Sequence, residues 1–284
     1  MNDLIKNPVL GAIAGDMIGV PYEFLRRGVH IERDFPLWSN DSKFSDDTAM
    51  TLAVAKWLLT EDLDKLNPRD LVLCMQEIGN KYPNVGYGGK FSQWLKEEDP
   101  QPYGSWGNGS AMRISPVGCA FKTLEDTLKI AEMSASVSHN HIEGIKGAKV
   151  IAELIYRILL YNDWETMKEP YMEGFLLVPS VDYKYKVDRT PQEIRDSGYT
   201  FKVSCQESVP EAISCFLYSH SYEETIREAI LLRGDTDTQA CIAGSLAAAY
   251  WGIPRDIADE ALDRLPSDLL HILENFSKMY NLPL

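Results

Sequence analysis

Apolar residues recur at helical spacing along most of the chain. Segments with one apolar face are 46–60, 125–137, 144–161, 207–218, 222–232, 237–251 and 256–280. Ser45 and Thr236 stand directly before two of these segments, and hydroxyl residues favour the first position of a helix. Alternating apolar and polar residues, typical of strands, are scarce, and the best run is 201–205. The pattern therefore predicts an all-α fold.

Three stretches between the predicted helices are irregular in sequence. They are 26–44, a segment rich in Gly, Pro and aromatic residues at 81–109, and a charged, mixed segment at 162–206 that forms either a lid or an excursion at the edge. Apolar residues continue through all three, so none reads as a flexible interdomain linker. We therefore expect a single domain over residues 1–284.

Composition and charge narrow the classes of partner. The chain has 284 residues, 45% of them hydrophobic, and 28 Lys+Arg against 42 Asp+Glu give a formal net charge of −14. This balance argues against duplex nucleic acid and anionic membrane surfaces, which both require basic patches. Five cysteines without a CxxC motif indicate reduced thiols. With neither a signal-peptide pattern nor a membrane-length apolar run, we expect a cytoplasmic protein.

Two acidic clusters stand at predicted helix starts. One is Ser45-Asp46-Asp47-Thr48, and the other runs from Asp235 through Asp237 to Thr238. Helix capping alone explains one or two acids in each cluster. Carboxylate and hydroxyl oxygens are also the ligands that Mg²⁺, Mn²⁺ and Ca²⁺ prefer. If the two helix starts meet, four carboxylates converge, and two divalent cations are the simplest way to neutralise them. The small residues of 240–249 suit a closely packed helix behind the second cluster.

Three further motifs carry polar chemistry. The glycine-rich stretch 104–113 can point backbone N–H groups at phosphate, although a glycine-rich turn that caps a helix is the commoner explanation. In Ser138-His139-Asn140-His141 the histidines lack a third zinc ligand, so we treat His139 as a ligand-contacting donor, or as structural. The stretch 15–24 carries Asp16 and Glu23, and its plain interpretation is a helix end with a surface glutamate.

Taken in order, six blocks resemble the ADP-ribosylglycohydrolase family over nearly the whole chain. These blocks are GAIAGDMIGVPYEF, FSDDTAM, SWGNGSAMRISPVG, SVSHNHIEGIKGA, SCQESVPEAI and RGDTDTQACIAG. The resemblance implies a compact, all-helical orthogonal bundle with two Mg²⁺ or Mn²⁺ ions in a central cleft. By motif match, the ions are held by Ser45, Asp46, Asp47, Asp235, Asp237 and Thr238.

The resemblance also implies catalytic and substrate-binding residues. Glu23 falls where the family carries a catalytically implicated glutamate, and we assign it proton transfer, with water activation by the metals that Asp46, Asp47 and Asp237 hold. The groove for ADP-ribose is lined by Gly107, Asn108, Gly109, Ser110, Met112 and His139. The implied activity is hydrolysis of the glycosidic bond at ribose C1″ of a modified protein side chain or a small ADP-ribosyl compound, with ADP-ribose as product.

Some residues depart from the family pattern or have two interpretations. Arg233 stands where a glycine is expected, Ser45 replaces a threonine and Ile142 replaces a proline. Trp106 either stacks on adenine or packs in the core, and we favour the core; Asp16 supports ligands rather than binding metal.

Two other functions stay open: a non-catalytic ADP-ribose-binding or structural protein, and a metal-dependent nucleotide phosphohydrolase. Arginine, serine, phosphate and acetyl linkages share the ADP-ribosyl half, so all four remain candidate substrates.

Overall fold

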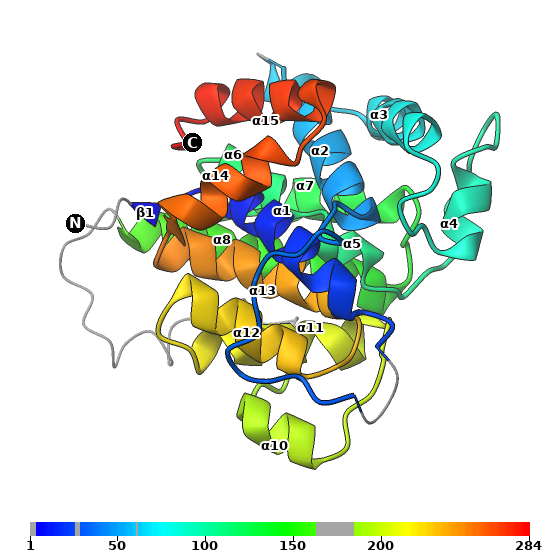
Figure 1. Ribbon diagram of the computed structural model, residues 1–284. Helices are drawn as coiled ribbons and strands as arrows, with labels where there is room; N and C mark the ends of the chain where they lie inside the picture. Colours follow the sequence, from blue (N-terminus) through cyan, green and yellow to red (C-terminus); the bar gives the residue numbers. More distant parts are fainter. Residues whose placement is uncertain (1–3, 26–28, 61, 163–184) are drawn as a thin grey trace.

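The computed structural model describes residues 4–25, 29–60, 62–162 and 185–284 (Figure 1). Helices dominate this part of the chain, which confirms the predicted all-α class. Within it, the one sheet has two short strands, β1 (Leu4–Ile5) and β2 (Ile253–Pro254), which pair antiparallel. No described helix combines the length and the apolar character required to cross a bilayer.

Two helices form the centre of the molecule, α1 (Pro8–Gly19) and α13 (Thr236–Tyr250) (Figure 1). Every residue of α1 is buried, as is α13 up to Ala249. Helix α1 begins where the Asn7 side chain accepts hydrogen bonds from two backbone N–H groups, and Pro8 occupies the first turn. Helices buried on all sides lie inside the core.

A row of glycines brings α1 into backbone contact with α13. Gly11, Gly15 and Gly19 are four residues apart, so they share one helix face. A Cβ on Gly15 would lie 2.1 Å from the carbonyl oxygen of Ala240, and one on Gly19 would lie 2.5 Å from Cα of Asp237. The close approach expected from the small residues of α13 is therefore confirmed.

The remaining helices pack around this pair. Helices α11 and α12 cover one side, and α14 and α15 lie on the other (Figure 1). Their bounds are α2 (Asp46–Trp57), α3 (Pro68–Lys81), α4 (Gly89–Trp94), α5 (Gly109–Met112), α6 (Ser115–Ala120), α7 (Leu124–Ser136), α8 (Ile142–Asn162), α10 (Pro191–Asp196), α11 (Cys205–Leu217), α12 (Tyr222–Leu231), α14 (Arg255–Asp263) and α15 (Ser267–Met279), with 3-10 turns η1 (Val20–Tyr22) and η2 (Leu63–Lys65).

The structure corrects several helix and strand predictions. The segment 256–280 is two helices, because α14 ends before Pro266 and α15 begins after it. The run 201–205 forms no strand; it contributes one isolated bridge between Ser204 and Gly107. Helix α3 was not predicted, and the irregular stretches 81–109 and 162–206 contain α4 and α10. Residues 163–184 of the second stretch lie outside the described part of the chain.

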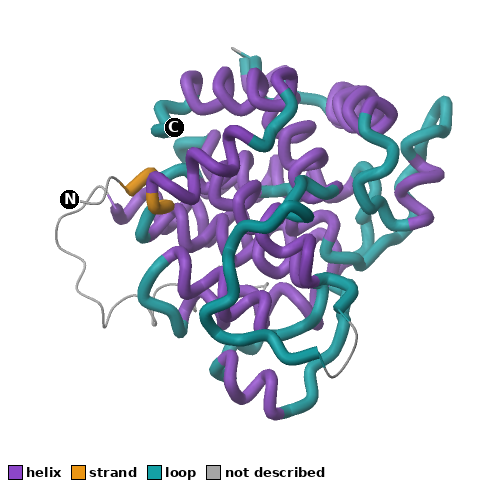
Figure 2. The backbone as a smooth tube through the Cα atoms, in the orientation of Figure 1, coloured by secondary structure: helices purple, strands orange, loops and turns teal. Residues whose placement is uncertain are grey.

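The described part of the predicted irregular segment 26–44 crosses the front of the molecule without regular structure (Figure 2). Side chains of later helices hold it in place. Arg227 donates to the Phe35 carbonyl at 2.7 Å, and Arg264 donates to the Ser42 carbonyl at 2.7 Å. This anchored segment delivers Ser45, the residue before α2, to the centre of the fold.

Candidate active site

A cavity of about 730 Å³ opens where the starts of α2 and α13 meet the glycine-rich stretch. Its size matches the pockets that hold small-molecule ligands. Nearly all the residues that the sequence proposed for metal, substrate or catalysis line it: Glu23, Ser45, Asp46, Asp47, Gly107, Asn108, Gly109, Met112, His139, Asp235, Asp237 and Thr238. Segments far apart in the chain therefore meet in one cleft.

The start of α2 is held by a carboxylate from α1. Asp16 is fully buried, and its Oδ2 accepts from the backbone N–H groups of Ser45 at 2.9 Å and Thr48 at 3.1 Å. The Thr48 hydroxyl donates to the same oxygen at 2.5 Å. Ser45 Oγ in turn accepts from the N–H of Asp47 at 3.1 Å. Asp16 thus orients the Ser-Asp-Asp turn toward the cleft.

The start of α13 faces that turn. Thr238 Oγ1 donates to Asp47 Oδ1 at 3.2 Å, which joins two helix starts that are 191 residues apart in sequence. Asn108 Nδ2 donates to Asp235 Oδ2 at 2.7 Å, so the glycine-rich stretch also contacts this cluster. The Thr238 N–H donates to Asp237 Oδ1 at 2.9 Å. The expected convergence of the two acidic clusters is confirmed.

Glu23 joins the same group of acids. It follows the 3-10 turn η1 at the end of α1, and one oxygen from each of Glu23, Asp235 and Asp237 lies within 4.8 Å of the others. The sequence assigned Glu23 to proton transfer alone. In the structure it is also one of three carboxylates able to hold a single metal ion.

The clustered acids are poorly compensated. Burial, then the charges of neighbouring acids, raises the pKa of Glu23 to about 8 and that of Asp46 to about 7. Burial raises the pKa of Asp235 to about 6, and the pKa values of Asp47 and Asp237 stand well above the usual range. Among the described residues, no lysine or arginine forms an ion pair with any of these five acids.

Two buried carboxylate oxygens also have no hydrogen-bond partner, Oδ1 of Asp16 and Oδ2 of Asp47. Unpaired buried anions are costly, so the cluster suits cations or protons.

The wall opposite the acids is formed by the glycine-rich stretch and His139. A Cβ on Gly109 would lie 3.1 Å from His139 Nε2, and one on Gly107 would lie 3.6 Å from it. The two glycines therefore leave room in front of the imidazole. His139 itself is 6% exposed, and Met112 lines the cavity beside it.

Two residues of this stretch do not lie as the sequence suggested. Ser110 is completely buried, and its hydroxyl donates to the Gly144 carbonyl at 2.7 Å, so it faces α8 and does not line the cavity. Trp106 is 54% exposed and packs edge-on against His141, which makes the favoured core position wrong. Its backbone accepts from Cys205, which pairs this stretch with the segment before α11.

Sequence reasoning missed part of the cavity lining. The additional lining residues include Phe24, Lys43, Lys90, Tyr103, Arg113 and Phe201. Phe24 and Phe201 stack with ring centroids 6.0 Å apart, although they come from opposite halves of the chain. Phe24 and Arg113 stood inside quoted motifs, and Phe201 stood in the run 201–205 predicted as a strand, whereas Lys43, Lys90 and Tyr103 came from stretches without periodicity.

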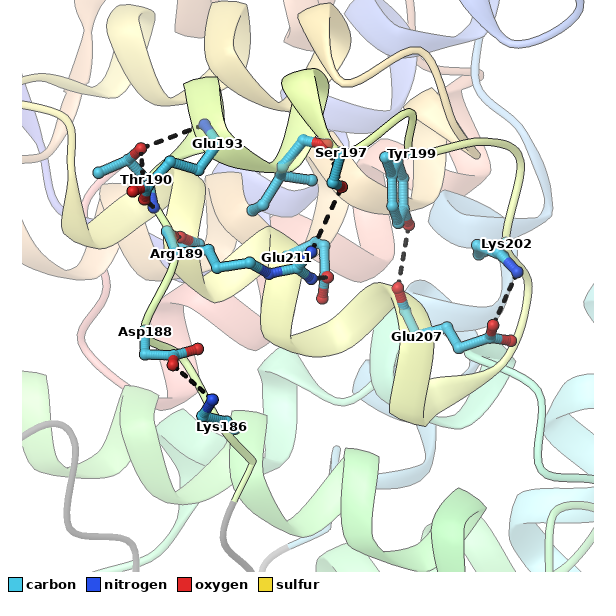
Figure 3. A network of polar contacts seen from close by, with 12 residues as sticks. Lys186, Asp188, Arg189, Thr190, Glu193, Ser197, Tyr199, Lys202, Glu207 and Glu211 are labelled. Carbon is cyan, nitrogen blue, oxygen red and sulfur yellow. Dashed lines mark hydrogen bonds and ion pairs between the residues drawn. The ribbon is translucent and has the colours of Figure 1, made fainter.

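Tyr199 supports the loop before α13, and Figure 3 shows its hydroxyl pointing toward the backbone of Glu207. The Tyr199 hydroxyl donates to the Glu207 carbonyl at 3.1 Å and accepts from Gln239 Nε2 at 2.7 Å. A Cβ on Gly234 would lie 2.8 Å from the Tyr199 ring, so this position has no room for a side chain. Arg233, the departure from the family pattern, has φ 62° and donates to the Val29 carbonyl.

The chain matches one protein family along almost its whole length. The family model described as ADP-ribosylglycohydrolase matches residues 2–282. The chain is similar to ADP-ribosylhydrolase ARH3 of Danio rerio, at 27% identity over 87% of this chain and 82% of the relative. It is similar to ADP-ribosylarginine hydrolase Tri1 of Pseudomonas putida (strain GB-1), at 25% identity over 88% of this chain and 71% of the relative.

A solved structure described as an ADP-ribosylglycohydrolase-related protein complex has the same fold. Its TM-score is 0.66 at 22% identity, over 97% of this chain and 98% of that one. The likeness extends over the whole bundle, including both helices that carry the acidic clusters.

Proposed function

Because the chain belongs to the ADP-ribosylglycohydrolase family and is therefore a hydrolase of ADP-ribosyl linkages, we propose that its activity depends on divalent metal. The proposed reaction cleaves the glycosidic bond between ribose C1″ of ADP-ribose and its acceptor. The observation that carries it is the convergence of five carboxylates in a cavity of about 730 Å³, none of which forms an ion pair with a lysine or arginine in the part of the chain that the structure describes.

The donor set fits Mg²⁺ or Mn²⁺. Its ligands are hard oxygens, from Asp46, Asp47, Asp235, Asp237, Ser45 and Thr238, with Glu23 within reach of two of them. The unpartnered Oδ2 of Asp47 is a further acceptor that a cation would satisfy. Two ions so held would neutralise the acids and act as Lewis acids toward ribose and water oxygens. Asp16 would keep the α2 ligands in place without binding metal.

We assign Glu23 to proton transfer. Cleavage of a glycoside builds oxocarbenium character on the ribose and negative charge on the leaving group, so a proton must move during the reaction. In the metal-free protein, burial and the neighbouring acids raise the pKa of Glu23 to about 8, and a carboxyl at the cavity wall is placed to give or take a proton. It is half-buried at the cavity wall, beside the exposed ring of Phe24. Substrate that enters past Phe24 would meet this carboxyl.

The opposite wall supplies groups for the ADP-ribosyl half. Backbone around Gly107 and Gly109 lies open in front of His139, and Lys43 and Lys90 bring positive charge to the cavity edge. Such groups suit the pyrophosphate of ADP-ribose. The acids lie at the starts of α2 and α13, and the open backbone of Gly107 and Gly109 lies in front of His139, which supports a ribose C1″ near the metals. The acceptor is a modified protein side chain or a small ADP-ribosyl compound.

A panel assay tests the proposal. Purified protein with Mg²⁺ is incubated with arginine-, serine-, acetyl- and phosphate-linked ADP-ribose, and released ADP-ribose is measured. Turnover of at least one linkage is expected, with loss on chelation and recovery when Mg²⁺ or Mn²⁺ is added. Asp46→Asn and Asp237→Asn should lower the rate by more than the roughly 10–100-fold that loss of an outer metal contact costs.

The matched control is Asp126→Asn. Asp126 also stands in the first turn of a helix, α7, but it is exposed and its carboxylate contacts only a capping threonine. It should keep full activity. Full activity of Asp46→Asn and Asp237→Asn would contradict metal dependence through these acids. Release of phosphate from nucleotides, without ADP-ribose release from any linkage, would favour the phosphohydrolase alternative.

A further inference from the structure

Arg113 is a buried cation without a carboxylate partner among the described residues. It is 1% exposed and follows α5 at the cavity wall. Its guanidinium donates to the carbonyls of Gly109 at 3.0 Å and Ser134 at 2.8 Å, and to Ser138 Oγ at 3.1 Å. Burial lowers its pKa only to about 10, so the group stays charged near neutral pH. A lone buried charge is expensive, which raises the question of what it does.

The contact with Ser138 determines where the hydroxyl proton goes. A guanidinium has donors only, so Ser138 Oγ must accept from Arg113. Ser138 is fully buried, and its second partner is His139 Nδ1 at 2.8 Å. No other acceptor for the hydroxyl occurs in the described part of the chain. Ser138 therefore donates its single proton to Nδ1 of His139.

Nδ1 that accepts a hydrogen bond carries no proton, so the neutral ring must carry it on Nε2. Nε2 faces the cavity between Gly107 and Gly109, and no described residue accepts from it. Burial, and then the positive charge of Arg113, holds the pKa of His139 well below its usual range. The other faces of the imidazole meet the rings of Phe91 and Tyr103 and carry no carboxylate.

We propose that Arg113 and Ser138 are positioning residues that lock His139 in the neutral Nε2–H tautomer and aim that N–H at an oxygen of the bound ligand. The role as ligand donor rests on the proposed function, since the ligand oxygen belongs to an ADP-ribosyl group. The tautomer lock is a property of the protein alone. A neutral imidazole donates a directed hydrogen bond without a second positive charge beside Arg113, whereas an imidazolium would add that charge.

Imidazole nitrogen NMR tests the lock directly. The chain has five histidines, and the His139 signals can be assigned with a His139→Asn variant. In the wild type with Mg²⁺, Nε2 should be protonated and Nδ1 unprotonated from about pH 8 to about pH 5.5, across the ordinary histidine pKa near 6.5. In Ser138→Ala, Nδ1 loses its donor, so the Nδ1–H tautomer should become populated. A wild-type ring that is an imidazolium or the Nδ1–H tautomer at neutral pH overturns the lock.

Ser134→Ala is the matched control. Ser134 lies four residues earlier, and its buried hydroxyl has no hydrogen-bond partner, while its carbonyl is what contacts Arg113. The control removes a buried hydroxyl of the same kind and leaves the relay intact. Its His139 spectrum should match that of the wild type. If Ser138→Ala shows the same spectrum as well, the relay through Ser138 is wrong.

Calorimetry with ADP-ribose tests the donor role. Loss of one fixed hydrogen bond predicts affinity about 5- to 10-fold weaker for Ser138→Ala and unchanged for Ser134→Ala. A changed tautomer with unchanged affinity would overturn the donor role. If the wild type fails to bind ADP-ribose, the proposed function fails, while the NMR result still decides the lock. Should Ser138→Ala not fold, the wild-type spectrum alone decides it.

Discussion

Arg233 shows how one residue can depart from a family pattern at a defined cost. Its φ of 62° lies in the left-handed region, which side chains other than glycine adopt with strain. The glycine that the family resemblance led us to expect here would adopt this conformation without strain. In this chain the arginine side chain reaches the Val29 carbonyl, and this contact ties the loop before α13 to the long segment that precedes α2.

Comparison of Arg233→Gly with Arg233→Ala isolates the effect of backbone conformation on the free energy of unfolding, because both variants remove the side-chain contact. The free energy of unfolding of the glycine variant should exceed that of the alanine variant by about 1 kcal/mol. The left-handed conformation penalises a Cβ by about 1–2 kcal/mol, and the greater freedom of glycine in the unfolded chain cancels part of this difference. Urea denaturation of both variants measures the difference. Equal stabilities would mean that the residue leaves the left-handed region in solution.

The residue types in the sequence predicted the chemistry of the cleft better than they predicted where each side chain points. We expected the acids to converge, because the same divalent cations can neutralise carboxylates at two helix starts. Ser110 could not be placed, because a helix of four residues is too short to show a periodic pattern of buried positions, and its hydroxyl faces α8. Trp106 was expected in the core, yet its exposed ring depends on a long-range bridge between Gly107 and Ser204.

At the scale of elements, the contact between α1 and α13 determines the geometry of the site. Gly19 sits on the backbone of Asp237, and Glu23 follows one 3-10 turn later. The spacing of Glu23 from Asp237 is therefore a consequence of helix packing. A change at Gly11, Gly15 or Gly19 should reach the acids, even though none of these three glycines lines the cavity.

Gly15→Ala should destabilise the protein by at least about 3 kcal/mol. The new Cβ would lie 2.1 Å from the backbone oxygen of Ala240, and a backbone atom in a packed core cannot move aside as a side chain can. Gly89→Ala, in α4, is the control, since a Cβ there meets nothing within 4 Å. Thermal unfolding compares the two. A Gly15→Ala variant as stable as Gly89→Ala would show that the helices are not in backbone contact.

Tyr199→Phe should lower stability by about 1–3 kcal/mol. The change leaves the Gln239 amide and the Glu207 carbonyl without their shared partner in a half-buried position. Tyr218→Phe is the control, because Tyr218 is 41% exposed at the end of α11. Chemical denaturation and the Mg²⁺ concentration for half-maximal activity are both measured. If neither the stability nor the Mg²⁺ concentration for half-maximal activity changes, Tyr199 does not support the loop before α13.

Helix positions were predictable where the apolar face was long. Helix α13 and α8 matched their predicted segments closely, whereas α4, α5, α6 and α10 have four to six residues each, too few to show a period. Helix α3 is a different case. It has an asparagine cap, a proline in the first turn and an apolar face at Leu71, Met75 and Ile78, so its signal was present in the sequence and was missed.

For the whole molecule, the acidic cluster links stability to pH and metal. Carboxyls with a raised pKa keep protons in the folded state that they have lost in the unfolded chain, where the pKa is near 4. Between that value and about 8, the pKa of Glu23, the folded state binds more protons. The free energy of unfolding therefore falls as pH rises through this window.

Metal-free protein should thus unfold at a temperature several degrees lower at about pH 8 than at about pH 6.5. His139 does not disturb this window, because its lowered pKa costs stability only below its unfolded value near 6.5. Added Mg²⁺ should raise the unfolding temperature, and more so at the higher pH. Calorimetry at several pH values measures both effects. If the unfolding temperature depends on pH to the same extent in the Asp46→Asn/Asp237→Asn double variant, the acidic cluster is not the origin of that dependence.

The backbone contact between α1 and α13 has a consequence for the redesign of this catalyst. Nothing along Gly11, Gly15 and Gly19 tolerates added volume, so the carboxylate wall is a fixed template that mutational libraries should leave untouched. Diversity belongs at Phe24, Lys90 and Phe201, whose side chains border the cavity outside the glycine row. Reprogramming the accepted leaving group would then proceed without disturbing the hydrolytic chemistry.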